Sequence, residues 1–181
     1  MYLLYFPFFL GMQIKNHKYR GVTIRMNSIT VSKEKTLKLT NVLIKDIQGD
    51  ELQEFQLIVE KMNNFIKVKG VQTLGPLIQY VKGVVNDEGQ LEVKISVLQQ
   101  TNQVIHHVEQ DYRTDSLIRI KHCLYCRYIG PEEKLKFAYD KLNLIAFEED
   151  IKLKGDSYTI FVNQEEDNIV ADVFMERMEN E

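Results

Sequence analysis

The sequence has too few cysteines for a disulfide framework. Cys123 and Cys126 are the only two in a chain of 181 residues, and small secreted domains held together by disulfides carry many more. We therefore expect a cytoplasmic protein with both cysteines as thiols. Residues three apart on a strand point to opposite faces, so this pair predicts neither a metal site nor a disulfide.

The sequence also lacks an excess of charge of either sign. Its 23 basic and 26 acidic residues are interleaved and give a net charge of -3. Nucleic-acid-binding domains concentrate positive charge to neutralise phosphates, so we expect no nucleic-acid partner. The same mixing argues against attachment to an anionic membrane surface. The length and the 44% hydrophobic content suit one globular domain.

Long hydrophobic runs are missing as well. The apolar stretch Met1 to Leu10 is far shorter than the ~20 residues that cross a bilayer, and it lacks the flanking features of a signal peptide. We hypothesise that translation starts at Met26, or else at Met12, because the codons for residues 20–23 can form a purine-rich ribosome-binding run. The competing interpretation is a real strand over residues 19–26. The intact mass of the native protein distinguishes the two.

From residue 37 onwards, the first half of the chain predicts a strand, a helix and a hairpin. Alternation over Leu39 to Ile47 predicts a strand, and Gly49 with Asp50 supplies a break and a helix N-cap. Apolar residues at spacings of three and four then predict an amphipathic helix to about residue 66. They are Leu52, Phe55, Ile58, Val59, Met62 and Phe65. Strands at Leu77 to Val85 and Leu91 to Leu98 follow, joined by a polar turn that ends at Gly89.

The second half repeats this order after a polar connection over residues 99–115, in which residues 104–108 form a candidate short edge strand. A strand is predicted at Ser116 to Tyr128, and a helix at Glu132 to Ile145 after the Gly130 and Pro131 break. The last two strands are predicted at Ser157 to Asn163 and Ile169 to Met175.

Together these elements predict an α+β fold of duplicated β-α-β-β units with a mostly antiparallel sheet. Neither unit covers its own core, so we expect the two units to lie side by side with both helices on one face. The other face would be concave and form a cleft. We expect the units at about 37–100 and 114–178, a single domain at 37–178, and an N-terminal extension at 1–36.

Several short motifs, in this order, resemble those of the GyrI-like small-molecule-binding domain, the effector-binding module of bacterial transcription regulators. They are Gly75 to Leu77 with Tyr80, Tyr128 to Pro131, Ala138 to Leu142, Tyr158 to Phe161, and Asp172 to Met175. The resemblance covers residues 37–178. It implies a cleft between the two units, lined by aromatic residues, that binds flat cations in some relatives and hydrolyses a strained small molecule in others.

One position departs from the family pattern. Where the relatives carry a glutamate that points into the cleft, this chain has Thr159, and a threonine hydroxyl neither neutralises a cation nor acts as a carboxylate base. We therefore predict an aromatic furrow without an internal negative charge. The candidate ligand-binding residues are Tyr80, Tyr125, Tyr158 and Thr159, with no catalytic residue, metal or cofactor. The competing interpretation of the tyrosines is core or cross-strand packing.

His106 and His107 are adjacent, so their side chains point in opposite directions if the segment is extended. His122 has apolar neighbours, which favours a hydrogen-bonded core residue.

The leading function is a stand-alone, non-catalytic bacterial protein that binds an apolar or aromatic small molecule. The second is an accessory factor whose cleft docks a helix or strand of a protein partner. The third is a hydrolase of a reactive small molecule.

Overall fold

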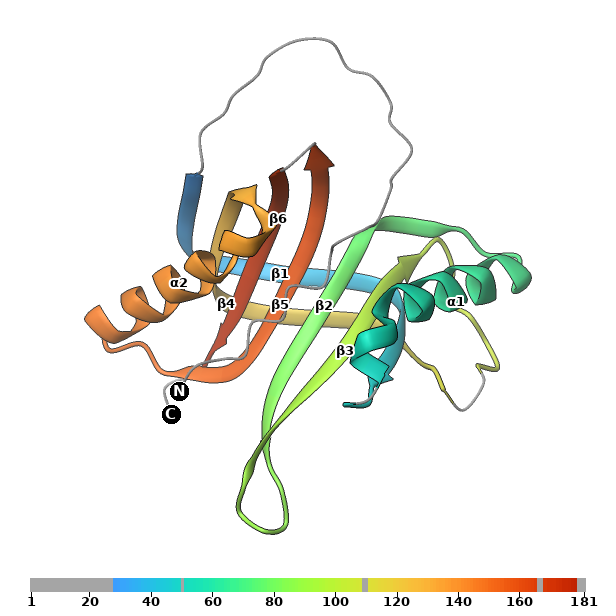
Figure 1. The fold of residues 1–181 in the computed structure, drawn as a ribbon, viewed down its shortest axis with the longest axis horizontal. Helices are drawn as coiled ribbons and strands as arrows, with labels where there is room; N and C mark the ends of the chain where they lie inside the picture. Colours follow the sequence, from blue (N-terminus) through green and yellow to red (C-terminus); the bar gives the residue numbers. More distant parts are fainter. Residues whose placement is uncertain (1–27, 50, 109–110, 166–167, 179–181) are drawn as a thin grey trace.

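The computed structural model describes residues 28–49, 51–108, 111–165 and 168–178. The strands and helices alternate along the chain as Figure 1 shows. They are β1 (Ser28–Ile47), α1 (Phe55–Val68), β2 (Thr73–Val85), β3 (Leu91–Thr101), β4 (Arg113–Pro131), α2 (Lys136–Glu148), β5 (Leu153–Glu165) and β6 (Asn168–Arg177). Short 3₁₀ turns at Glu51–Glu54 and Glu132–Lys134 precede the two α-helices.

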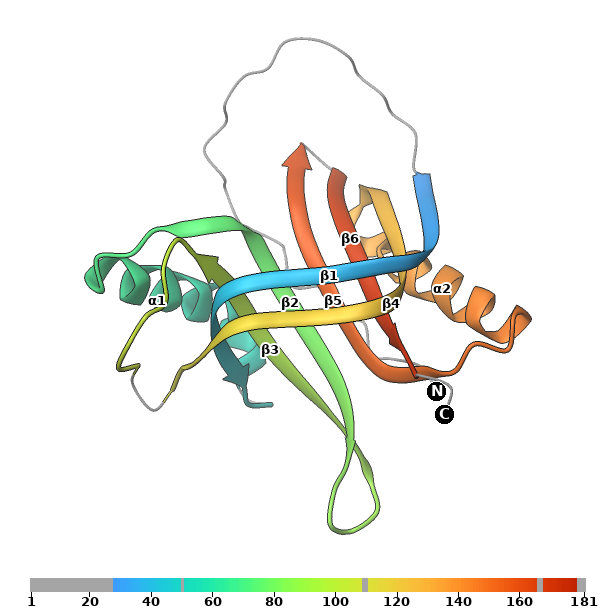
Figure 2. The ribbon, with the colours of Figure 1, turned by 180° about the vertical axis from the view of Figure 1, so that it is seen from behind.

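All strand pairs are antiparallel, and the sheet closes on itself in the order β1-β3-β2-β5-β6-β4. The prediction of an α+β fold with a mostly antiparallel sheet is confirmed. Two pairings join the halves of the chain, β2 with β5 and β1 with β4. The long β1–β4 pair crosses the side of the other strands that faces the viewer in Figure 2. This closure was not expected from the sequence.

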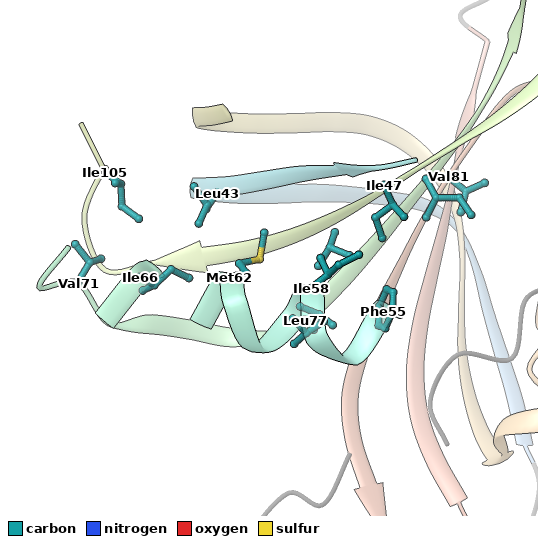
Figure 3. Packing of buried hydrophobic residues seen from close by; sticks show 13 residues of the cluster. Leu43, Ile47, Phe55, Ile58, Met62, Ile66, Val71, Leu77, Val81 and Ile105 are labelled. Atoms are coloured by element: carbon teal, nitrogen blue, oxygen red, sulfur yellow. The ribbon is translucent and has the colours of Figure 1, made fainter. Parts of the chain in front are cut away.

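Helix α1 forms because its apolar residues recur on one face, and that face covers β1, β2 and β3. Five of its residues are buried: Phe55, Ile58, Val59, Met62 and Ile66. They pack against Leu43 and Ile47 of β1, and against Leu77 and Val81 of β2, as Figure 3 shows. We call this set the α1 cluster. Four residues of the predicted stripe are therefore buried, Ile66 joins them, and Leu52 and Phe65 are partly buried against the same cluster. The helix ends two residues beyond the expected end.

Helix α2 covers the second half of the sheet in the same way. Its buried residues Ala138, Leu142, Ile145 and Ala146 pack on β4 and β6 in a set that we call the α2 cluster. The break at Pro131 and the following 3₁₀ turn place its first α-helical residue at Lys136. Within the described ranges, neither helix has the length and apolar character needed to cross a membrane.

A third cluster fills the sheet face that lies away from the helices. It takes side chains from all six strands, and the β1–β4 pair contributes to it directly. Its buried members are Leu37, Leu39, Val42, Ile44, Ile78, Leu98, Ile120, Cys123, Tyr158 and Phe174. The expectation of an open concave face opposite the helices is therefore wrong, because this face is packed as a core.

Several element boundaries differ from the prediction. Residues 28–36, assigned to an N-terminal extension, are the first part of β1, and Ser28 to Ser32 pair with β4. Strand β3 continues to Thr101, because the Thr101 hydroxyl donates to a backbone carbonyl of β1 at 2.8 Å. Residues 104–108 form no strand, and Ile105 is buried against the α1 cluster instead. The hypothesis about the start of translation concerns residues outside the described ranges.

Candidate functional site

The three candidate tyrosines lie in one row across neighbouring strands. Tyr80 of β2 is opposite Tyr158 of β5, Tyr158 is opposite Phe174 of β6, and Phe174 is opposite Tyr125 of β4. The rings of Tyr80 and Tyr158 stack with centroids 4.5 Å apart, and those of Tyr125 and Phe174 lie 4.9 Å apart. We call these four side chains the aromatic row. It belongs to the third cluster, on the face away from the helices.

Carboxylates lie at both ends of the aromatic row. The Tyr80 hydroxyl donates to Asp156 at 2.6 Å, and the Tyr125 hydroxyl donates to Asp172 at 2.8 Å. Asp172 is only 9% exposed and also accepts two hydrogen bonds of 2.8 Å from Arg127. The predicted absence of an internal negative charge is therefore wrong for this face. The charge is compensated, because a guanidinium that bonds both carboxylate oxygens satisfies them.

The row's tyrosines are hydrogen-bond donors rather than acids at neutral pH. Burial, with a smaller effect of the hydrogen bond to Asp172, raises the pKa of Tyr125 to about 12. Burial and the charge of Asp156 raise the pKa of Tyr158 to about 12. Two of the three tyrosine hydroxyls already donate to carboxylates. The aromatic row therefore agrees with the competing interpretation from the sequence, in which the tyrosines pack against one another across neighbouring strands.

Replacing Asp172 with alanine is expected to lower the free energy of unfolding by about 1–3 kcal/mol, because the partly buried Tyr125 hydroxyl loses its acceptor. Asp156→Ala, at the more exposed end of the row, should cost less than about 1 kcal/mol, since water can replace the lost bond there. Urea unfolding of both variants checks this. Equal losses would mean that the burial of Asp172 does not strengthen its contacts.

Thr159 does not lie with the tyrosines. Its hydroxyl is hydrogen-bonded to the hydroxyl of Tyr139 on α2, and Thr159 is 1% exposed. Successive residues of a strand point to opposite faces, so Thr159 lies on the helix side while Tyr158 faces the third cluster. The expectation that both line one furrow is corrected. Whether either residue binds a ligand stays a prediction.

Polar residues on the helix side gather where β2 meets β5. Gln79 is opposite Thr159, and Ser157 is opposite Val81. We call Gln79, Ser157 and Thr159 the polar seam. The cross-strand rows that contain these residues continue onto β3 and β6, where they are apolar. Val97 and Ile95 of β3 belong to the α1 cluster, and Val173 and Met175 of β6 belong to the α2 cluster. These two rows are therefore hydrophobic under each helix and polar at the join.

The polar seam lies between the two helices. Strands β2 and β5 run through the middle of the molecule, with α1 and α2 on opposite sides, as Figure 1 and Figure 2 show. Phe161, two residues beyond Thr159, packs against both the α1 cluster and the α2 cluster. Ser157 is 2% exposed, and its hydroxyl oxygen has no hydrogen-bond partner in the structure as described. The seam residues themselves are uncharged.

Sequence reasoning selected Thr159 but missed Gln79 and Ser157. A signal was present, because Gln79 falls between Leu77 and Val81 at the same strand parity, where an apolar residue is expected on a buried face. Ser157 is two residues before Thr159 on β5, so its side chain points to the same buried face. A polar residue at an inward position of a strand is more informative than an exposed apolar one.

The two cysteines point to opposite faces, as alternation predicts. Cys123 lies in the third cluster and Cys126 in the α2 cluster, and burial raises their pKa values to about 11 and about 12. His122 is not a core residue. Its side chain is 60% exposed and contacts Glu34 at 3.0 Å, because the backbone at His122 has a positive φ of 56° and turns the ring outwards.

Comparisons with known proteins identify solved structures with a similar fold. No protein-family model and no curated protein matches the chain. The EcmrR protein in a complex with DNA aligns with a TM-score of 0.58 and 13% identity over 84% of this chain and 57% of EcmrR. An uncharacterized conserved protein from Listeria innocua aligns at 0.50 and 12% identity over 85% of this chain and 93% of that one. SAV2435 bound to tetraphenylphosphonium aligns at 0.45 and 8% identity, over 81% and 94%.

The similarities to EcmrR and to the Listeria innocua protein show a shared fold, and a shared fold does not by itself establish a function. This chain spans just over half of the length of EcmrR. The fold is one that solved bacterial proteins, such as the one from Listeria innocua, also adopt.

Proposed function

We propose that this chain is a non-catalytic binding protein for an uncharged, apolar or aromatic small molecule, and that the ligand lies over the polar seam between α1 and α2. The observation that carries the proposal is the Ser157 hydroxyl, which is buried without a hydrogen-bond partner among the described residues. A buried polar group left unsatisfied costs roughly 1–3 kcal/mol. Each such group in a folded protein calls for an explanation, and a ligand that supplies the missing partner is the explanation proposed for Ser157.

The arrangement of the strands supports this location. The order β1-β3-β2 in the first half corresponds to β4-β6-β5 in the second, and the two triplets meet at β1 with β4 and at β2 with β5, of which the second junction lies between the helices. Gln79 and Thr159 are opposite each other at that join. The resemblance to GyrI-like domains implies a site between two β-α-β-β units, which the sequence placed on the face away from the helices. Because that face is packed as a core, the proposal keeps the junction of the two units and moves the site to the helix side. Ligand sites tend to lie at such junctions.

The chemistry of the polar seam favours binding over hydrolysis. A general base needs a side chain that can take up a proton, such as an imidazole or a carboxylate, and a buried cation needs an opposite charge. The seam residues are an amide and two hydroxyls. Asp172 lies on the other side of the sheet and is bonded to Arg127. A neutral ligand therefore fits the seam better than a charged one.

A matched series of ligands tests the proposal. Methyl 2-naphthoate, with smaller and larger aromatic esters, is expected to raise the melting temperature by about 3–6 °C at tenfold saturation. The cation 2-naphthamidine and the anion 2-naphthoate should give smaller shifts, because either charge would be desolvated without a partner. Differential scanning fluorimetry measures all three.

Two phenylalanine variants locate the site. Phe161→Ala is expected to remove the ester's effect, since Phe161 contacts both helix clusters beside the polar seam. Phe147→Ala should leave it unchanged, because Phe147 is 86% exposed on α2. The proposal fails if no neutral member of the series stabilises the protein, or if Phe161→Ala binds it as the parent does.

A further inference from the structure

The polar seam offers hydrogen-bond donors and acceptors in equal measure. The Gln79 amide carries both in one plane, and the Ser157 hydroxyl can act as either. The Thr159 hydroxyl already shares a hydrogen bond with Tyr139, which leaves Gln79 and Ser157 as the groups that a ligand can address. Both are neutral, so they discriminate by hydrogen-bond pattern and not by charge.

Register places these two side chains within reach of one ligand group. Gln79 is opposite Thr159, and Ser157 is opposite Val81, two residues further along β2. Gln79 and Ser157 are thus diagonal neighbours on the same face, where Cα atoms lie about 7–8 Å apart. A long glutamine side chain spans part of that distance, so one small planar polar group bound over the seam can reach both its amide and the Ser157 hydroxyl.

We propose that the polar seam recognises a ligand by a carboxamide or lactam, an uncharged group whose donor nitrogen and acceptor oxygen are attached to the same carbonyl carbon. This inference rests on the proposed function and names its ligand class. The ligand amide forms two parallel hydrogen bonds with the Gln79 amide, N–H to C=O in each direction, and the Ser157 hydroxyl bonds the ligand's second polar edge. An ester lacks the donor, and an amidine or carboxylate brings a charge that these residues do not neutralise.

Burial strengthens the discrimination. Ser157 is 2% exposed, and a site whose buried polar groups expect a partner rejects analogues that leave those groups unpaired. The apolar residues on either side, among them Val81 and Phe161, suit the hydrocarbon part of the ligand. The aromatic row offers no equivalent, because the Tyr80 and Tyr125 hydroxyls are occupied by carboxylates.

The test compares three probes that differ only in the polar group: 2-naphthamide, N,N-dimethyl-2-naphthamide and methyl 2-naphthoate. Isothermal titration calorimetry is expected to show 2-naphthamide binding the parent protein at least tenfold more tightly than the other two. Gln79→Leu should remove that preference while the affinity for the ester stays within about twofold. Ser157→Ala should reduce the preference in part. Gln90→Leu, an exposed position in the β2–β3 turn, is the matched control and should keep it.

The outcomes separate this inference from the proposed function. If the ester binds as tightly as the amide, the ligand class is wrong and the binding function stands. If none of the probes and none of the larger esters binds, both are wrong. If the amide preference survives in Gln79→Leu and in Ser157→Ala, the amide is recognised elsewhere. Ser157→Ala should also have an unfolding midpoint equal to or above the parent's, because it removes an unsatisfied hydroxyl, and a marked loss would mean that Ser157 is satisfied within the fold.

Discussion

Leu142→Ala is expected to lower the free energy of unfolding by about 2–5 kcal/mol. Leu142 is fully buried in the middle of α2, and the α2 cluster surrounds it on β4 and β6. Truncation to alanine loses the free energy gained by transferring the leucine side chain from water to the core. It also leaves a cavity that the closed sheet can fill only in part by moving inwards. Chemical denaturation followed by far-ultraviolet circular dichroism measures the loss.

The matched control is Phe137→Ala on the same helix. Phe137 is 48% exposed, so this larger truncation should cost less than about 1 kcal/mol. Because β1–β4 and β2–β5 pairs join the halves, Leu142→Ala should still unfold in one transition. A second transition, with the half that contains Met62 remaining folded, would show that the halves are independent domains.

The helices were predictable from sequence because their signal is local. Met62 and Leu142 stand in stripes with spacings of three and four, and each stripe needs only an apolar surface to cover. The hairpin between β2 and β3 was predictable for the same reason. Its polar turn with Gly89 lies between two alternating segments.

The closure of the sheet was not predictable by the same reasoning. It depends on β1, in which the short alternating segment Ser28 to Ser32 is followed at once by the polar run Ser32 to Lys35, so that the alternation is interrupted. That segment also carries register shifts where it pairs with β4. Its pairing partners lie about a hundred residues away, and long-range pairing leaves no local pattern. Without this closure, the face away from the helices looked open.

The candidate site was predicted only in part, for a reason that strand geometry makes plain. Tyr158 and Thr159 are consecutive, so they point to opposite faces and could never line the same furrow. The alternation of polar and apolar residues did not show whether the side chain of Tyr158 or that of Thr159 points towards the helices. The Tyr139–Thr159 hydrogen bond settles that point for Thr159. The pairing of Asp172 with Arg127, a residue 45 positions away, had no local signal either.

Thr159→Glu is expected to destabilise the protein by about 3–5 kcal/mol at neutral pH, because it places an unpaired carboxylate at a position that is 1% exposed. Burial raises the pKa of the new carboxyl above its unfolded value of about 4.3. Below that unfolded value the carboxyl is protonated in both states, so the charge penalty is absent there. The penalty grows as the pH rises through the folded-state pKa and is complete above it.

Thr159→Gln is the control for size, because glutamine has the same shape and does not titrate. The stability difference between the two variants should be near zero at about pH 4 and widen towards pH 8, as measured by urea unfolding at each pH. The shared loss of the Tyr139 hydrogen bond cancels in that difference. A difference that stays constant with pH would mean that the new carboxyl reaches water.

The same variant reverses the charge preference of the polar seam if the seam binds ligands. In Thr159→Glu, the cation 2-naphthamidine should stabilise the folded protein by neutralising the buried carboxylate, and the effect should appear only at a pH where that group is ionised. Thr159→Gln should show no response to the amidine. Binding of 2-naphthamidine to neither variant, while neutral esters still bind the parent, would mean that the ligand lies between the helices but out of reach of position 159.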